Sequence, residues 1–253
     1  MSLKSLFAVL AIALSSCLHA QEAVQEMQRI QEMRSLAYLA ATNLVVFYNL
    51  DATPFESENA ENYRQSFERL QQIADQNNYS LVSSELRKIE DLAGQLDALP
   101  RDLNHVRTVY IPYQLLLNPL FDAQQRIEQD LGQRYTALAN GNDDWQQGLH
   151  ELSLDHSRIM QQYAMLTFTA LAYLNVQDPT LSVADERIRQ QFETLKTRYP
   201  EQRAELEKLS INYNFIRQRL VEQPRPWIPG RALFYLSRNV KALDEAAART
   251  TAR

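Results

Sequence analysis

Arginine residues near the start of each half of the chain are the side chains best suited to binding a small ligand. Arg29 and Arg34 lie at the two ends of the segment RIQEMR, and Arg158 begins the segment RIMQQY, which ends at Tyr163. A guanidinium group can hold an oxyanion through two parallel hydrogen bonds. These four residues are therefore candidate ligand-binding residues. The alternative is that they occupy solvated positions on helix surfaces.

Residues that could build a catalytic or metal centre are few. After residue 20 the histidines are His105, His150 and His156, and the one cysteine of the chain is Cys17. The Gly-x-Ser-x-Gly turn that exposes a hydrolase nucleophile is absent. His150 and His156 are too far apart to share a metal as an i, i+4 pair, so we expect surface histidines near helix ends. The sequence predicts a non-enzymatic protein with no catalytic residue, metal or cofactor.

A second candidate site lies near the C-terminus, in the segment PRPWIPGR. It contains Arg225, Trp227 and Arg231, and Arg238 and Lys241 follow on a predicted terminal helix. Basic and aromatic side chains together are suited to docking a partner protein or an anionic lipid. The alternative is a stiff joint between helices whose charges are solvated.

Composition favours an all-α fold and excludes one class of partner. The 253 residues include only five Gly and nine Pro, so the chain has few places for sharp turns. The formal net charge of −5 provides no basic field for nucleic acid phosphates. We therefore expect long helices with short joints and no nucleic acid partner.

The first twenty residues are typical of a secretory signal peptide. Lys4 precedes the apolar run LFAVLAIAL, and a cleavage position follows Ala20. The protein is therefore expected to be periplasmic or otherwise exported. Cys17 ends the segment LSSC, which resembles a bacterial lipoprotein box, and its lipidation would add a membrane anchor. Ordinary cleavage and lipidation both remain open, and membrane contact is expected only with a lipidated cysteine.

The sequence matches itself at an offset of 125 positions, as in the pair Tyr38 and Tyr163. The match gives twelve identities over the 44 ungapped positions that begin at these two tyrosines. Such agreement indicates an internal duplication. We predict two tandem four-helix-bundle-like units at residues 22–141 and 143–250, separated by the turn cluster NGNDD at 140–144.

Helix boundaries in the two units are predicted from matching residues. Ser57 and Ser182 each follow a proline-containing break, where a hydroxyl can cap a new helix. Pro112 and Pro229 are each suited to the first turn of a unit's last helix. Apolar residues recur at helical spacing in four predicted stripes. The stripes are Tyr63, Phe67, Leu70 and Ala74; Val82, Leu86, Ile89, Ala93 and Leu96; Ile188, Phe192, Leu195 and Tyr199; and Leu206, Leu209, Tyr213, Ile216 and Leu220.

The arginine segments near the start of each predicted bundle resemble a known sensor family. They are similar to the N-terminal sensor domain of type IV pili methyl-accepting chemotaxis transducers (PilJ-type), which is related to nitrate/nitrite sensor-kinase input domains. The resemblance implies tandem sensor domains with Arg29 and Arg158 as ligand arginines and Arg34 and Tyr163 beside them. It also implies a small oxyanion, such as nitrate or nitrite, as the ligand.

Two functions follow as expectations. The first is a ligand-sensing or signal-modulating helical protein that acts through an unidentified envelope or membrane signalling partner, because no output domain follows the helices. The second is a structural envelope adaptor that binds another protein and no small ligand. A pocket lined by Arg29 or Arg158 would favour the sensor, and an apolar stripe on an outer face would favour the adaptor.

Overall fold

The computed structural model describes residues 3–49, 56–101, 106–139, 144–166, 180–221 and 228–250. Within these ranges all regular structure is helical and there is no strand, which confirms the all-α prediction. The helices are α1 (Leu3–Phe47), α2 (Ser57–Gln76), α3 (Ser80–Asp97), α4 (Val106–Leu138), α5 (Asp144–Ala164), α7 (Leu181–Arg198), α8 (Arg203–Val221) and α9 (Pro229–Thr250), with a 3₁₀ turn at Pro200–Gln202.

The predicted apolar stripes on α2, α3, α7 and α8 form a large part of the core. Every residue of the stripes on α3 and α8 is buried. On α2 and α7 the same holds except for Tyr63 and Tyr199, which are half-buried and pack against the core. Burial of one such side chain contributes about 1.5–3 kcal/mol, so these stripes are the main source of stability for their helices.

The helix starts predicted at Ser57 and Ser182 are right to within one residue, but the predicted serine caps are wrong. Ser57 is already the first residue of α2, and α7 begins one residue before Ser182. The preceding residues, Glu56 and Thr180, occupy the N-cap positions and make no side-chain capping hydrogen bond. A serine inside the helix lies past the position from which its oxygen reaches the free N–H groups.

The two prolines expected in first turns behave differently. Pro229 is the first residue of α9, as predicted, but α4 begins at Val106, well before Pro112. Proline inside a helix costs about 3 kcal/mol. The helix persists because the same segment buries Tyr113 and Leu117 completely, and their burial offsets that cost.

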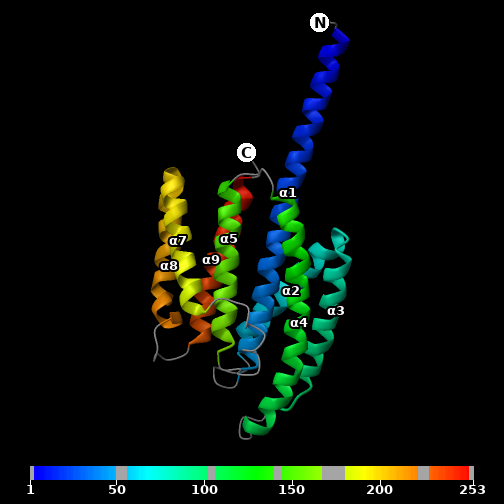
Figure 1. Cartoon of the computed structure of the whole chain (residues 1–253). Helices are drawn as coiled ribbons and strands as arrows, with labels where there is room; N and C mark the ends of the chain where they lie inside the picture. Colours follow the sequence, from blue (N-terminus) through cyan, green and yellow to red (C-terminus); the bar gives the residue numbers. More distant parts are fainter. Residues whose placement is uncertain are drawn as a thin grey trace.

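The helices pack in two groups, which lie side by side in Figure 1. The contacts within each group close into a ring of helices. In the first ring α1 contacts α2, α2 contacts α3, α3 contacts α4, and α4 contacts α1. In the second, α5, α7, α8 and α9 contact one another in the same cyclic order. Helix α1 also packs against α5 and α9, so these three helices form the joint between the rings.

Helix α1 is the longest element and continues beyond the rings at its N-terminal end (Figure 1). It runs as one helix through Ala20, the predicted cleavage position. Across the parts of the chain that the structure describes, no helix is both long and apolar enough to cross a membrane. Several sequence predictions concern positions outside the described residues. These are the turn at 140–143, the side chain of Cys17, His105, Arg225 and Trp227.

Candidate functional site

Two of the four predicted ligand residues meet on one carboxylate. Arg34 of α1 donates to both oxygens of Glu128 of α4, with Nε–Oε2 and Nη2–Oε1 distances of 3.1 and 2.6 Å. Arg158 of α5 donates to the same Oε1 atom at 3.3 Å. Glu128 therefore joins three helices, α1, α4 and α5, through charge-assisted hydrogen bonds.

A second carboxylate extends this group of charges. Asp155 of α5 accepts two hydrogen bonds from Arg187 of α7, both at 2.6 Å, and lies 3.8 Å from Arg158. We call Arg34, Glu128, Asp155, Arg158 and Arg187 the Glu128 cluster. Its three arginines and two carboxylates give a formal charge of 3 − 2 = +1.

The Glu128 cluster is largely enclosed. The side chains of Arg34 and Arg158 are 9% and 31% exposed. Burial by itself lowers the pKa of Arg158, but Tyr38, Glu128 and Asp155 together raise it, so the guanidinium stays charged. An added anion would have to compete with Glu128, whose carboxylate already pairs with Arg34 and Arg158.

The other two predicted ligand residues lie elsewhere. Arg29 pairs with Glu26 one turn earlier on α1, and Glu26 also accepts a hydrogen bond from Tyr79. Tyr163 is buried, and its hydroxyl accepts a hydrogen bond of 2.9 Å from the backbone N–H of Ile228. The structure therefore brings Arg34 and Arg158 together but places neither Arg29 nor Tyr163 beside them.

The expectation that the histidines lie at the surface is wrong for His150. It is buried, with Nε2 2.8 Å from the amide oxygen of Gln28 and Nδ1 2.8 Å from the hydroxyl of Tyr135. An amide oxygen can only accept, so Nε2 carries the proton and Nδ1 accepts from Tyr135. Burial, reinforced by the charge of Arg34, lowers the pKa of His150 to about 3. The ring is therefore a neutral hydrogen-bonding group inside the joint.

His156 is also buried rather than exposed. Its Nδ1 donates to the carbonyl of Leu152 at 2.8 Å, and its Nε2 lies 3.3 Å from the side-chain amide nitrogen of Asn239, which donates to it. Burial lowers the pKa of His156 to about 4. The described residues contain no group of three or more His, Cys, Asp or Glu placed to hold a metal ion.

The half-buried Asp244 of α9 has its carboxylate in the joint, with no cation beside it among the interactions described. The hydroxyls of Ser35 and Ser153 and the amide of Gln31 hydrogen-bond to its carboxylate, but its Oδ1 atom has no partner among the described residues. Burial outweighs these bonds and raises the pKa of Asp244 to about 7. The carboxyl group therefore titrates near neutral pH.

The largest concave surface described is a groove of about 1000 Å³ between α2 and α9. Helix α1 contributes Leu36, Leu39 and Asn43 to its lining, and α8 contributes Phe215. Helices α2 and α9 do not pack closely on each other. The groove thus lies where the two rings face each other beside the joint, and it is lined by residues of both.

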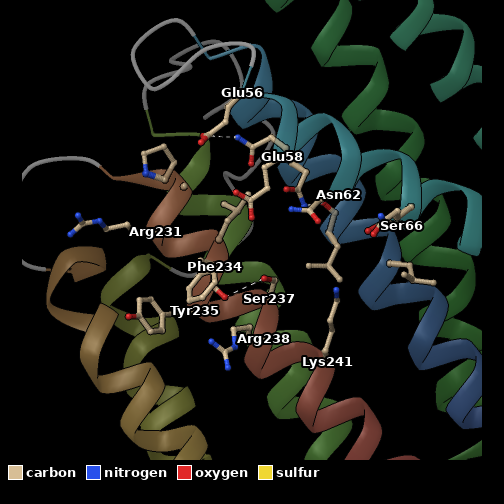
Figure 2. Close-up of a pocket in the computed structure, with 18 of the residues that line it drawn as sticks. Glu56, Glu58, Asn62, Ser66, Arg231, Phe234, Tyr235, Ser237, Arg238 and Lys241 are labelled. Atoms are coloured by element: carbon tan, nitrogen blue, oxygen red, sulfur yellow. Dashed lines mark hydrogen bonds between the residues drawn. The ribbon is translucent and has the colours of Figure 1, made fainter.

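The α9 side of the groove carries an unneutralised basic stripe. Arg231, Phe234, Arg238 and Lys241 recur at spacings of three, four and three, which places them on one face of the helix. None of the three cations pairs with a carboxylate among the described residues. We call these four residues the α9 stripe. Figure 2 shows Lys241 in the space beside α2, and Arg231 on the side of α9 away from α2.

Aromatic rings accompany the charges of the α9 stripe. Phe234 packs edge-on against Tyr235, whose ring lies 4.9 Å from that of Phe215 on α8. Arg238 lies over the Phe234 ring at 5.1 Å. Phe215 and Phe234 nevertheless remain 66% and 49% exposed. Two exposed phenylalanines next to unpaired cations make a surface suited to a partner with apolar and acidic groups.

The α2 side of the groove is acidic and amide-rich. Glu58 and Asn62 line it, as Figure 2 shows, and the exposed Gln65 is also part of its lining. Arg69, further along the same wall, is already paired with Glu32 at 2.8 Å. The two walls therefore differ in charge, and an occupant bound between them would meet cations on one side and acceptors on the other.

No family model matches the chain, and no curated protein or solved structure was found to be similar to it.

Part of the α9 wall of the groove could be predicted from the sequence, whereas the α2 wall could not. Arg231, a predicted docking residue, lines the groove with Arg238 and Lys241, which follow it at helical spacing. The wall on α2 was missed because nothing in the sequence places Glu58 or Asn62 opposite a helix more than 160 positions away. The 3-4-3 spacing of the α9 stripe was the available signal.

Proposed function

We propose that the protein is a non-enzymatic, exported helical protein that acts through a partner, and that the partner docks in the groove between α2 and α9. The observation that carries this proposal is the α9 stripe, whose three cations have no carboxylate partner in the part of the chain that the structure describes and lie beside exposed Phe215 and Phe234. An exposed apolar surface rimmed by charge is characteristic of a binding site. This corresponds to the adaptor function expected from the sequence, with a defined docking surface.

A ligand-sensing function is a second candidate, with the Glu128 cluster as its site. The observation in its favour is that Arg34 and Arg158, both predicted to bind an oxyanion such as nitrate or nitrite, converge in a cluster of net charge +1. The Glu128 carboxylate counts against it, because the anion must displace part of an existing ion pair. The adaptor function is therefore the preferred one.

An internal duplication would account for the shared architecture. The two rings have the same cyclic order of contacts, and the aligned residues Phe67 and Phe192, and Leu70 and Leu195, are buried in both. These correspondences support, as a proposal, two four-helix units descended from one. Export with a signal peptide at residues 1–20 remains part of the same proposal, as does a lipid anchor at Cys17.

Site-specific photo-crosslinking tests the docking site. A photoreactive phenylalanine is placed at Phe234, in the groove, and in a matched control at Val183 on α7, which is 55% exposed and outside the groove. We expect a discrete protein adduct from position 234 and none from position 183 in cells that produce the protein. Adducts from both positions, or from neither, would contradict the proposal.

Thermal unfolding with millimolar nitrate or nitrite tests the second candidate. A ligand that binds only the folded state stabilises it by about 2.7 kcal/mol at a hundredfold excess over its dissociation constant. The sensor function requires a rise in the midpoint that Arg158→Ala abolishes. Arg29→Ala should keep the rise, because Arg29 lies outside the Glu128 cluster. No rise with either anion removes this candidate.

A further inference from the structure

The shape of the groove narrows the kind of partner that it fits. Its lining on α9 extends from Ile228 to Lys241, and on α2 from Glu56 to Arg69. At 1.5 Å per residue each wall is about 20 Å long. A compact small molecule fills only part of such a channel, whereas a helix of about four turns has the matching length.

The chemistry of the α9 stripe sets the charge of the occupant. Arg231 and Arg238 are seven positions apart, and Lys241 lies three further, so cations repeat along about three turns of one face. Carboxylates at similar spacing on a helix in the groove would meet Arg238 and Lys241, whereas Arg231 lies on the side of α9 away from α2 (Figure 2). Because none of the three cations has a carboxylate partner among the described residues, such contacts would add opposite charges without first breaking an ion pair.

The other residues that line the groove determine where the occupant should be apolar, and which groups it should present to α2. Phe234 is half-exposed, and Leu36, Leu39 and Leu233 lie along the groove with it. Apolar side chains at i, i+3, i+4 and i+7 would cover these residues. On the other side, Glu58 and the amide groups of α2 favour a basic or hydrogen-bonding edge.

From these features we infer that the groove binds an acidic amphipathic helix of about four turns, presented by a partner protein, with its acidic edge along the α9 stripe. The inference rests on the proposed function, since it specifies the partner of the same docking site. A lipid surface fits less well, because the half-buried Leu36 of α1 lines the recess between α2 and α9, where a flat bilayer cannot reach it.

Selection from a peptide library tests this inference. A displayed library of 18-residue helix-forming peptides, randomised without charge bias, is selected on the whole protein. We expect the enriched peptides to share an apolar stripe flanked on one edge by Asp or Glu. The outcome that overturns the inference is no enrichment, or enrichment without an excess of acidic residues.

A charge-reversal variant then locates the binding. In the test variant Arg231, Arg238 and Lys241 are replaced by Glu, and in a control variant Arg64, Arg87 and Arg189, exposed outside the groove, are replaced by Glu. Both variants are checked for helical content by circular dichroism. We expect the selected peptides to bind the test variant at least tenfold more weakly than the native protein, and the control variant within twofold. An equal loss of peptide binding in both variants would overturn the inference, because it would show that the net charge of the protein, and not the α9 stripe, governs binding.

Two further results separate this inference from the proposed function. Vesicles containing phosphatidylglycerol should not bind, and vesicle binding that the test variant loses would replace the helix with a membrane surface. A crosslink from position 234 to a protein, combined with no preference for acidic helices, would leave the docking site in place and overturn its assignment to an acidic helix.

Discussion

Arginine has opposite roles in the Glu128 cluster and in the α9 stripe. In the cluster, Arg34 is almost enclosed and shares Glu128 with Arg158. In the stripe, Arg238 lies over an exposed ring, with no carboxylate among the described residues. The same side chain stabilises the fold where a counter-charge is within reach, and is free for binding where none is. Spacing along the sequence does not distinguish these two cases.

Removing the carboxylate at the centre of the cluster should cause the largest destabilisation. Glu128→Gln leaves Arg34 enclosed without its counter-charge, and breaking one side of a buried ion pair costs about 3 kcal/mol. Chemical denaturation should show this loss. Glu61→Gln, which removes an exposed partner of Arg64, should change the unfolding free energy by less than about 0.5 kcal/mol. Equal effects of the two variants would show that the cluster is not structural.

Unlike Glu128, Asp244 has no cation beside it among the interactions described. It should therefore make the unfolding free energy depend on pH. Burial raises the pKa of Asp244 from its ordinary value of 3.8 to about 7 in the folded state, so its contribution to stability is fully present below about pH 4 and is lost as pH rises to 7. Asp244→Asn should remove this loss, which is about 1.4 kcal/mol for each pKa unit of the shift.

The measurement is the difference in unfolding free energy between the native protein and Asp244→Asn at pH 5 and pH 8. The difference cancels the opposite contribution of His150 and His156, whose lowered pKa values reduce stability as pH falls below 6.5. We expect Asp244→Asn to gain more at pH 8. Asp122→Asn, at an exposed position on α4, should give parallel curves, and parallel curves for Asp244→Asn would refute the role of its carboxyl group.

The hydrogen bond between Tyr135 and His150 should have an intermediate effect. Tyr135→Phe removes the donor to a buried ring nitrogen and should destabilise the protein by about 1–2 kcal/mol. Tyr235→Phe, at the edge of the groove, is the matched change at a half-buried tyrosine and should have an effect within a few tenths of a kcal/mol. Urea unfolding of the two variants tests this order.

The smallest effect on stability is expected in the α9 stripe. Arg238→Ala removes no ion pair seen among the described residues, so its unfolding free energy should stay within about 0.5 kcal/mol of the native value. Binding of a selected acidic helix should nevertheless weaken measurably by fluorescence anisotropy. A destabilisation as large as that of Glu128→Gln would remove the contrast between the two regions.

Local periodicity predicted the helices well, because the residues that bury each stripe lie three and four positions apart in the sequence. The stripes on α3 and α8 are buried in full for this reason. The capping roles of Ser57 and Ser182 failed because a shift of one or two residues moves a hydroxyl out of the N-cap position.

The environment of a polar side chain could not be predicted in the same way. His150 is buried because Gln28, Tyr135 and the surrounding helices enclose it. Gln28 belongs to the other ring of helices, the one formed by α1 to α4. Glu128 was not a candidate, although it connects two predicted ligand arginines. Such contacts depend on how α1, α4 and α5 meet, which a repeating apolar pattern does not specify.

The cyclic order of the rings has a consequence for how the chain folds. Within each ring, most contacts join helices that are close in the sequence, so comparatively little chain entropy is lost before packing begins. The contacts of α1 with α5 and α9 join distant segments and require the largest loss of chain entropy. We expect each ring to form quickly, and the joint, with its buried polar groups, to be the slow step that completes folding.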